Sequence, residues 1–213
     1  MSGAIGQTVS VAPEAVQPLG FDPIVEAHKR WRERWPEAER MAAATAVIRV
    51  QRIVMTATER ALVPFELTFA RYEALVLLAF SRQGRLPLGK MGARLQVHPT
   101  SVTNAIDRLE AQGFVRRADH PNDRRTTLAE ITTEGRAVLE KATIAVTAAQ
   151  FGLGMLRAGD LVDLSQILHR IRKSAGDFTG EAPPPPASSR AGRKQRNDPI
   201  KTRRRIDAIR GPK

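Results

Sequence analysis

One side of a predicted helix in the middle of the chain carries short polar side chains suited to hydrogen bonding. The segment from Thr100 to about Gln112 is expected to be helical, so that at about 100° per residue its polar and apolar side chains separate. Asparagine can pair bidentately with adenine, and Ser or Thr hydroxyls can bind several bases, so this side favours contact with base edges in a DNA major groove. An ordinary solvated face is the alternative, although such a face usually carries more Lys and Glu. The polar side consists of Thr100, Ser101, Thr103, Asn104, Asp107 and Arg108.

The neighbouring elements must hold this polar side outward. A shorter helix is predicted over residues 88–95, followed by a tight turn at Gln96 and Val97. His98 can cap the second helix, with Pro99 at its first position. The opposite side of the second helix is apolar and can pack on the first one. This apolar stripe consists of Val102, Ile106 and Leu109.

A polar hairpin is predicted directly after the second helix. Two strand candidates, residues 114–117 and 126–131, flank a turn-forming loop, and helix, turn, helix and hairpin in this order predict a winged helix-turn-helix. Arginine at the end of a narrow ribbon can enter a minor groove, where the potential is most negative. Asp123 is interpreted as a brace that pairs with an arginine and holds the loop. The alternative is a charged surface hairpin without a partner. The arginines concerned are Arg116 and Arg117 on the incoming strand and Arg124 and Arg125 near the tip.

The composition argues against several other classes of protein. The chain of 213 residues contains no cysteine, which excludes disulfides, thiol catalysis and zinc–thiolate sites. Its four histidines show no metal-ligand spacing, and neither a glycine-rich phosphate loop nor a nucleophile motif is present, so we expect no enzyme, cofactor or metal. The longest apolar run, residues 74–80, is far shorter than the ~20 residues that a bilayer requires. No signal peptide is evident, and a cytoplasmic protein without membrane contact is expected.

The excess positive charge is confined to two parts of the chain. Residues 81–128 hold nine Arg/Lys and four Asp/Glu, residues 181–213 hold ten and three, and the rest of the chain balances. Clusters of this kind are typical of proteins with a polyanionic partner, here double-stranded DNA. Two functions follow: a sequence-specific regulator that uses the winged helix, or an architectural, weakly specific DNA-binding protein driven by the basic tail. The two differ in salt dependence and in specificity ratio.

The rest of the sequence predicts a mainly helical protein with a small β-hairpin wing. Residues 1–20 lack any period and are expected to be disordered, as is a Pro-rich and then basic tail over residues 179–213. Three further helices with apolar stripes are expected, over residues 37–62, 132–151 and 160–175.

Several of these segments together resemble the MarR family of bacterial regulators. The resemblance covers about residues 40–178 of a domain at 21–178, with the DNA-binding winged helix at about 68–131. Gln96 stands where the family often has glycine, so a more strained turn is expected. The matching segments are Leu67–Tyr72, Leu95–Thr103, Leu109–Arg117, Asp123-Arg124-Arg125, and Ile131-Thr132 with Gly135.

The resemblance implies a symmetric homodimer and a response to a small molecule. Helices 37–62, 132–151 and 160–175 would intertwine with those of the partner, and two recognition helices ~34 Å apart would read a near-palindromic operator. Family members usually sense a ligand between the dimer helices and the DNA-binding lobe, which implies a ligand-responsive repressor with a small aromatic or anionic effector. The expected DNA contacts are His98, Thr100, Ser101, Thr103, Asn104, Arg108, Arg116, Arg124 and Arg125. The candidate effector contacts are Trp31, Met55, Phe65, Phe69, Arg71 and Tyr72, for most of which core packing is the alternative role.

Overall fold

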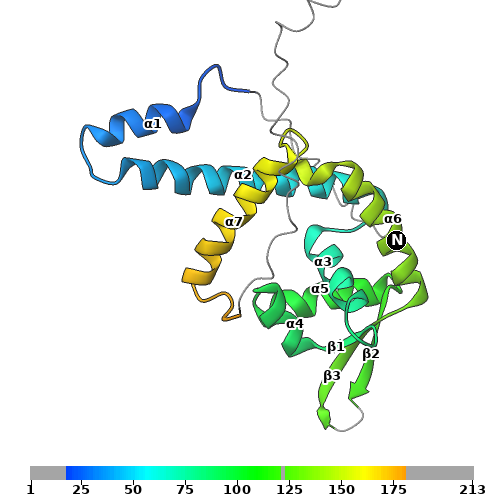
Figure 1. The fold of residues 1–213 in the computed structure, drawn as a ribbon. Coiled ribbons are helices and arrows are strands. Elements are labelled where there is room, and N and C mark those ends of the chain that lie inside the picture. Colours follow the sequence, from blue (N-terminus) through cyan, green and yellow to red (C-terminus); the bar gives the residue numbers. More distant parts are fainter. Residues whose placement is uncertain (1–17, 121–122, 181–213) are drawn as a thin grey trace, which may run out of the picture. The chain divides into compact units, whose positions relative to one another are not determined.

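The computed structural model describes residues 18–120 and 123–180, and the expectations for the chain's two ends fall largely outside these ranges. The chain divides between Gly152 and Leu153 into two compact units, each described by itself. The mainly helical fold with a small antiparallel sheet is confirmed (Figure 1). The first unit contains α1 (Pro23–Arg32), α2 (Ala38–Leu62), η1 (Val63–Phe65), α3 (Phe69–Ala79), β1 (Arg85–Pro87), α4 (Leu88–Leu95), α5 (Pro99–Ala111), β2 (Val115–His120), β3 (Asp123–Ile131), α6 (Thr133–Ala148) and η2 (Gln150–Gly152). The second unit contains α7 (Ala158–Ser174).

Side-chain caps fix where the helices of the winged domain begin. The Thr68 hydroxyl accepts a hydrogen bond from the backbone N–H of Arg71 at the start of α3. At the start of α5, His98 Nδ1 accepts from the backbone N–H of Thr100 at 3.3 Å. Thr132 caps α6 in the same way, 2.9 Å from the N–H of Gly135. The capping residues therefore set the boundaries that place α5 relative to its neighbours.

The turn between α4 and α5 has the strained backbone that the sequence predicts. Gln96 adopts a left-handed conformation with φ 53° and ψ 39°, a region that costs a non-glycine residue roughly 1–2 kcal/mol. The backbone N–H of Val97 then bonds to the carbonyl of Gly92 at 3.2 Å and closes the end of α4. This tight reversal allows α5 to follow α4 after only three residues.

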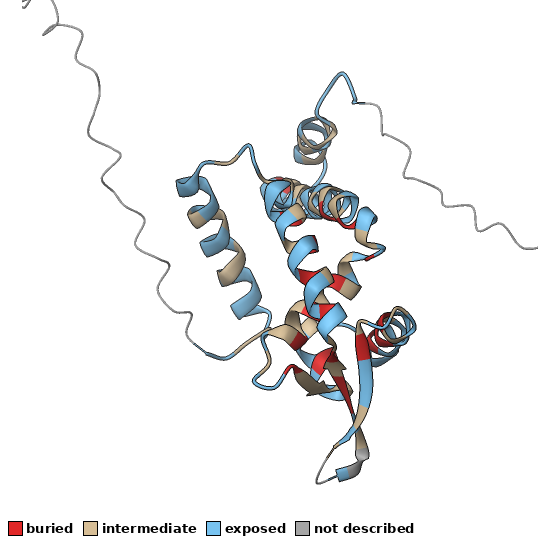
Figure 2. Ribbon diagram, turned by 90° about the vertical axis from the view of Figure 1, so that its right-hand side faces the viewer, coloured by how far each residue is buried: buried red, intermediate tan, exposed pale blue. Residues whose placement is uncertain are grey.

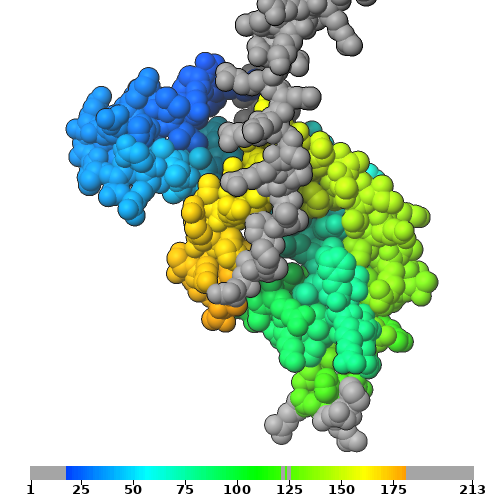
Figure 3. Space-filling view, viewed as in Figure 1, coloured from blue at the N-terminus to red at the C-terminus, as the bar shows by residue number. Residues whose placement is uncertain are grey.

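The sheet has one strand more than the predicted hairpin. Its order is β1-β3-β2, with both pairs antiparallel, and Arg85 in β1 lies opposite Glu130 in β3. A three-residue strand that ends in proline has no alternation from which it could be recognised, which explains why the sequence did not reveal it. The hairpin strands are also longer than expected, since pairing extends outward to His120 and Asp123 beyond the apolar positions. The hairpin consequently projects beyond the helices as a wing (Figures 1 and 3).

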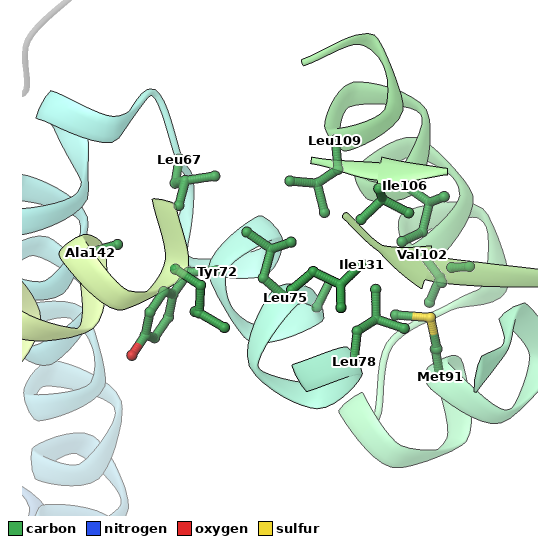
Figure 4. Packing of buried hydrophobic residues seen from close by; sticks show 14 of the residues in the cluster. Leu67, Tyr72, Leu75, Leu78, Met91, Val102, Ile106, Leu109, Ile131 and Ala142 are labelled. Carbon is green, nitrogen blue, oxygen red and sulfur yellow. The ribbon is translucent and has the colours of Figure 1, made fainter. Parts of the chain in front are cut away.

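The core lies where α3, α5 and the sheet meet (Figure 2). Leu75 and Leu78 of α3 face Ile106 and Leu109 of α5, and all four are 0% exposed (Figure 4). Met91 of α4 closes this cluster, also at 0% exposure. Burying aliphatic side chains of this size contributes about 1.5–3 kcal/mol each. The predicted apolar stripe of α5 is thus buried, which turns the other side of the helix outward.

The last predicted helices differ from the observed ones at their ends. The helix expected over residues 132–151 ends at Ala148, because Gln150 and Phe151 adopt left-handed φ angles of 49° and 51°. The helix expected over residues 160–175 begins earlier, at Ala158, where Asp160 accepts a hydrogen bond from the N–H of Arg157 at 3.1 Å. Within residues 18–120 and 123–180, no helix has both the length and the apolar character needed to span a bilayer.

Candidate nucleic-acid interface

The outward side of α5 carries the polar residues that the sequence placed there. Val102 is 3% exposed and Ile106 and Leu109 are 0% exposed, so the helix cannot rotate without exposing its core side. Ser101, Asn104 and Arg108 lie on the exposed side. In the described part of the chain these three side chains make no hydrogen bond or ion pair within the protein. Their donors and acceptors are therefore available to a partner.

Two other predicted contacts help to build the first turn of α5. His98 Nδ1 accepts the N–H of Thr100, which leaves the Nε2 atom of the neutral ring as a donor that can point outward. The Thr103 hydroxyl donates to the carbonyl of Pro99 at 3.1 Å, so its oxygen can still accept a hydrogen bond. Both residues can contact a partner, but each has a structural role as well.

The second arginine of the incoming strand, Arg117, compensates the acidic groups of α5. Arg117 of β2 bonds to Asp107 at 2.5 Å and to Glu110 at 2.7 Å. These contacts raise the pKa of Arg117, chiefly through the hydrogen bond to Asp107. They also neutralise negative charge beside a surface that would face DNA. The three-residue spacing of the two acids on one helix face was the available signal.

Arg116 points to the other face of β2 and has its own partner. It bonds to Glu130 of β3 at 2.9 Å, and this hydrogen bond lowers the pKa of Glu130 and raises that of Arg116. The pair joins the two strands of the wing. A contact from Arg116 to DNA would therefore compete with, or share, this ion pair.

The wing tip is only partly described. Residues 121–122 and the side chains of Arg124 and Arg125 lie outside the described part of the structure. Asp123, the predicted brace, accepts a hydrogen bond from the hydroxyl of Thr126 at 2.6 Å. This bond ties the acid to its own strand, and its pairing with an arginine stays a prediction.

The predicted effector residues are distributed over several places. Phe69 and Tyr72 line a cavity of about 550 Å³ together with Leu139 of α6. The Tyr72 hydroxyl lies 3.2 Å from that of Thr143. Glu73 supplies the one carboxyl among the described residues that line this cavity, and burial raises its pKa.

The other four residues of that set lie elsewhere. Trp31 of α1 contacts Trp35, which follows that helix, with ring centroids 5.0 Å apart and ring planes tilted by 56°. The Trp31 Nε1 donates to the carbonyl of Pro36 at 2.8 Å. Met55 is half-buried in α2, and Phe65 packs against the core from η1. Arg71 lines a different cavity, next to α5. Over residues 18–120 and 123–180, no group of His, Asp and Glu side chains is placed to hold a metal ion.

Comparison with known proteins gives a consistent result. The model of the MarR family matches residues 67–127, a segment that includes α3, α4, α5 and most of the wing. An HTH-type transcriptional regulator of Bacillus subtilis, YhbI, is 36% identical over 121 residues, which is 57% of this chain and 73% of that protein.

Two solved structures from Streptomyces coelicolor share the fold. Sco5413, a MarR family transcriptional regulator, is 46% identical with a TM-score of 0.63 over 68% of this chain and 100% of that chain. Sco3205, a MarR family transcriptional regulator in complex with DNA, is 26% identical with a TM-score of 0.61 over 66% of this chain and 94% of that chain.

Proposed function

The chain belongs to the MarR family of transcriptional regulators, and we propose that it is a ligand-responsive repressor that binds a near-palindromic operator as a homodimer. The observation that carries the proposal is the outward side of α5. Its apolar stripe is fixed in the core, while Ser101, Asn104 and Arg108 are exposed and make no hydrogen bond or ion pair within the described part of the chain. A helix of this kind fits a major groove, where short polar side chains reach base edges.

Base recognition is assigned to the middle of α5. Asn104 can donate to and accept from one adenine, and Ser101, one turn earlier, can hydrogen-bond a neighbouring base. The wing adds arginines that suit a minor groove, where narrow A-tracts have the most negative potential. Base contacts supply specificity, whereas contacts with the phosphates hold the register of the protein on the duplex.

Exposed apolar side chains on the long helices support the homodimer. They are spread along α2, α6 and α7, and burying them against a second copy would remove about 25 cal/mol of unfavourable hydration per Å². A twofold dimer presents two copies of α5 to successive major grooves and thereby selects a near-palindrome. A dimer seated across promoter DNA also blocks access to it, which is the basis for proposing repression. The exposed residues are Val47, Ile48, Val50, Ile53, Ile144, Leu161, Ile167 and Ile171.

The cavity beside α3 and α6 is the proposed effector site. Its volume of about 550 Å³ lies in the range of small-molecule pockets, roughly 300–1,000 Å³, and Phe69, Tyr72 and Leu139 give it an aromatic and apolar wall. Glu73 can accept a hydrogen bond from a ligand, whereas an anionic ligand finds no cation among the described lining residues. The cavity thus favours an aromatic effector with a hydrogen-bond donor.

Selection of binding sites from a randomised duplex pool tests the proposal. Full-length protein is expected to enrich a motif of two inverted half-sites with centres about 10 bp apart, because one α5 from each protomer enters each major groove. The same motif should occur in genomic fragments that co-purify with the protein. Failure to enrich any motif, together with tight binding to arbitrary DNA, would instead indicate an architectural protein driven by its basic tail.

A further inference from the structure

A second cavity separates the start of α3 from the exposed side of α5. It has a volume of about 600 Å³, and its charged lining groups are two guanidinium groups, Arg71 from α3 and Arg108 from α5. The described lining residues include no carboxylate. Ser101 and Asn104 form part of the same wall, so the cavity is continuous with the surface assigned to base recognition.

Neutral partners hold Arg71 in position without cancelling its charge. Its Nη1 donates to the Gln112 side-chain oxygen at 3.1 Å, and its Nε donates to the Thr68 hydroxyl at 3.3 Å. The Gln112 amide in turn donates to the backbone carbonyl of Glu66 at 3.1 Å. The guanidinium is therefore oriented by a chain of hydrogen bonds that links the end of α5 to the loop before α3.

The charge of this cavity is unbalanced within the described structure. Burial, and after it the charge of Arg108, lower the pKa of Arg71, while Glu66 has a smaller opposite effect. Arg116 and Arg117, only a few residues beyond α5, are by contrast each paired with a carboxylate. Two like charges that face one concave site are what an anionic ligand would stabilise.

We propose that this cavity binds one phosphate of the DNA backbone between Arg71 and Arg108, and that this contact sets how α5 lies in the major groove. The inference rests on the proposed function, and it gives Arg71 a role in binding DNA. A helix inside a groove about 12 Å wide has phosphates on both flanks, and the start of α3 lies beside one flank of α5. A planar guanidinium can bind a phosphate through two parallel hydrogen bonds.

The variant Arg71→Gln removes one charge and keeps a polar side chain. Because phosphate binding is independent of sequence, the variant should bind both the selected duplex and a scrambled duplex about tenfold to a hundredfold more weakly. The slope of log K against log salt should become shallower by about 0.9 for each phosphate that the variant no longer neutralises. Arg82→Gln, beyond the other end of α3, changes the same net charge away from the cavity and should retain wild-type affinity. Thermal unfolding verifies that both variants are folded.

Methylphosphonate substitution identifies the phosphate itself. Neutralising one backbone position at a time should reveal a position that weakens the wild-type protein but leaves Arg71→Gln unaffected, since that variant already lacks the guanidinium. Gln112→Ala keeps both charges and should lose affinity at that same position, because Gln112 orients Arg71. Arg71→Lys should recover part of the affinity.

Two results would overturn the inference. One is wild-type affinity and salt slope for Arg71→Gln on both duplexes. The other concerns the same variant in thermal unfolding. If Arg71→Gln binds DNA as wild type does but is no longer stabilised by millimolar inorganic phosphate, the cavity binds a free anion and not the DNA backbone. Failure of the chain to select any DNA motif would contradict the proposed function alone, because the scrambled duplex still tests the phosphate contact.

Discussion

Asn104 has the donors and acceptors of a base-reading residue and no hydrogen-bond partner in the described part of the chain. Other polar residues at α5 already have partners within the protein. His98 and Thr103 hydrogen-bond to the backbone of the first turn, and Asp107 is paired with Arg117. A side chain that stabilises nothing within the protein can be replaced at little cost in folding. Its loss then reports on binding alone.

Replacing Asn104 with alanine should separate specific from non-specific binding. A bidentate contact with adenine contributes about 1–3 kcal/mol, so Asn104→Ala should lose that amount on the selected duplex and little on a scrambled one. Fluorescence anisotropy titrations of both duplexes measure the difference. Equal losses of affinity on the two duplexes would show that Asn104 contacts the DNA backbone. No loss on either duplex would show that it does not contact DNA.

Glu73 should make stability depend on pH. Burial raises its pKa, so the folded protein holds the proton more tightly than the unfolded chain does. The stabilisation by this proton is complete below the ordinary carboxyl pKa and is lost as the pH rises through the raised pKa of the folded state. Glu73→Gln should therefore be more stable than wild type at pH 7, by less than about 1 kcal/mol because water screens a half-exposed carboxyl.

The pH series carries its own control. The advantage of Glu73→Gln should vanish near pH 3, about a unit below the ordinary Glu pKa, where the carboxyl is protonated in both states. Urea unfolding at a fixed protein concentration measures the free energy of unfolding of each variant. The control Glu140→Gln, on the exposed side of α6, should show no comparable increase in stability at pH 7. A Glu73→Gln advantage that is the same at both pH values would mean that packing, not ionisation, is responsible.

The joint between α5, the wing and α6 is the element-level feature that fixes the interface. Thr132 donates to the carbonyl of Gly113 at 2.8 Å, and its backbone N–H bonds to the carbonyl of Phe114 at 3.0 Å. Gly135, in the first turn of α6, packs against that same carbonyl. The end of α5, the start of β2 and the start of α6 are thus locked together.

Gly135→Ala should disrupt this joint. A Cβ atom at Gly135 would overlap the Phe114 carbonyl oxygen and lie 3.0 Å from Ile131 Cγ1. Overpacking against backbone should cost about 1–3 kcal/mol or more. Gly89→Ala in α4 meets nothing within 4 Å and should be neutral or stabilising by up to about 1 kcal/mol. Equal stabilities of the two variants in denaturant titrations would contradict the role assigned to the joint.

The wing should contribute mainly through charge. Arg124→Ala combined with Arg125→Ala is expected to weaken binding to any duplex and to make the salt slope shallower by about 0.9 per phosphate that the wing no longer neutralises. Asp123→Ala should also weaken binding, although it removes a negative charge, because Asp123 holds Thr126 in the same strand. Titrations at two salt concentrations test both variants, and stronger binding by Asp123→Ala would rule out the bracing role.

At the scale of the whole molecule, helix caps and apolar periodicity predict the helices well. They do not predict features that depend on residues far apart in the sequence. The cap at His98 and the apolar stripe of α5 depend on neighbours in sequence, and both predictions are confirmed. Strand β1 depends on pairing with residues 128–130, more than forty positions away, and its three residues carry no pattern of their own. The sequence therefore does not predict β1, and only the structure shows its pairing with β3.

The distribution of the effector candidates shows a similar limit. Phe69, Tyr72 and Glu73 recur at helical spacing and line one cavity, whereas Arg71 points about 100° away from Tyr72 and lines another. Arg71 and Tyr72 are adjacent in sequence, but helix geometry separates their side chains. The exposed orientation of Ser101, Asn104 and Arg108 was, by contrast, accessible from periodicity alone.

The central claim is that α5 reads a DNA sequence, and paired titrations test it most directly. Full-length protein is titrated into the selected duplex and into a scrambled duplex of equal length, each at two salt concentrations. Specific sites are typically bound about 10³-fold or more tightly than non-specific DNA, and this preference should persist as salt weakens both complexes. Equal affinities that decline together with salt would contradict the claim and would leave only electrostatic, sequence-independent binding.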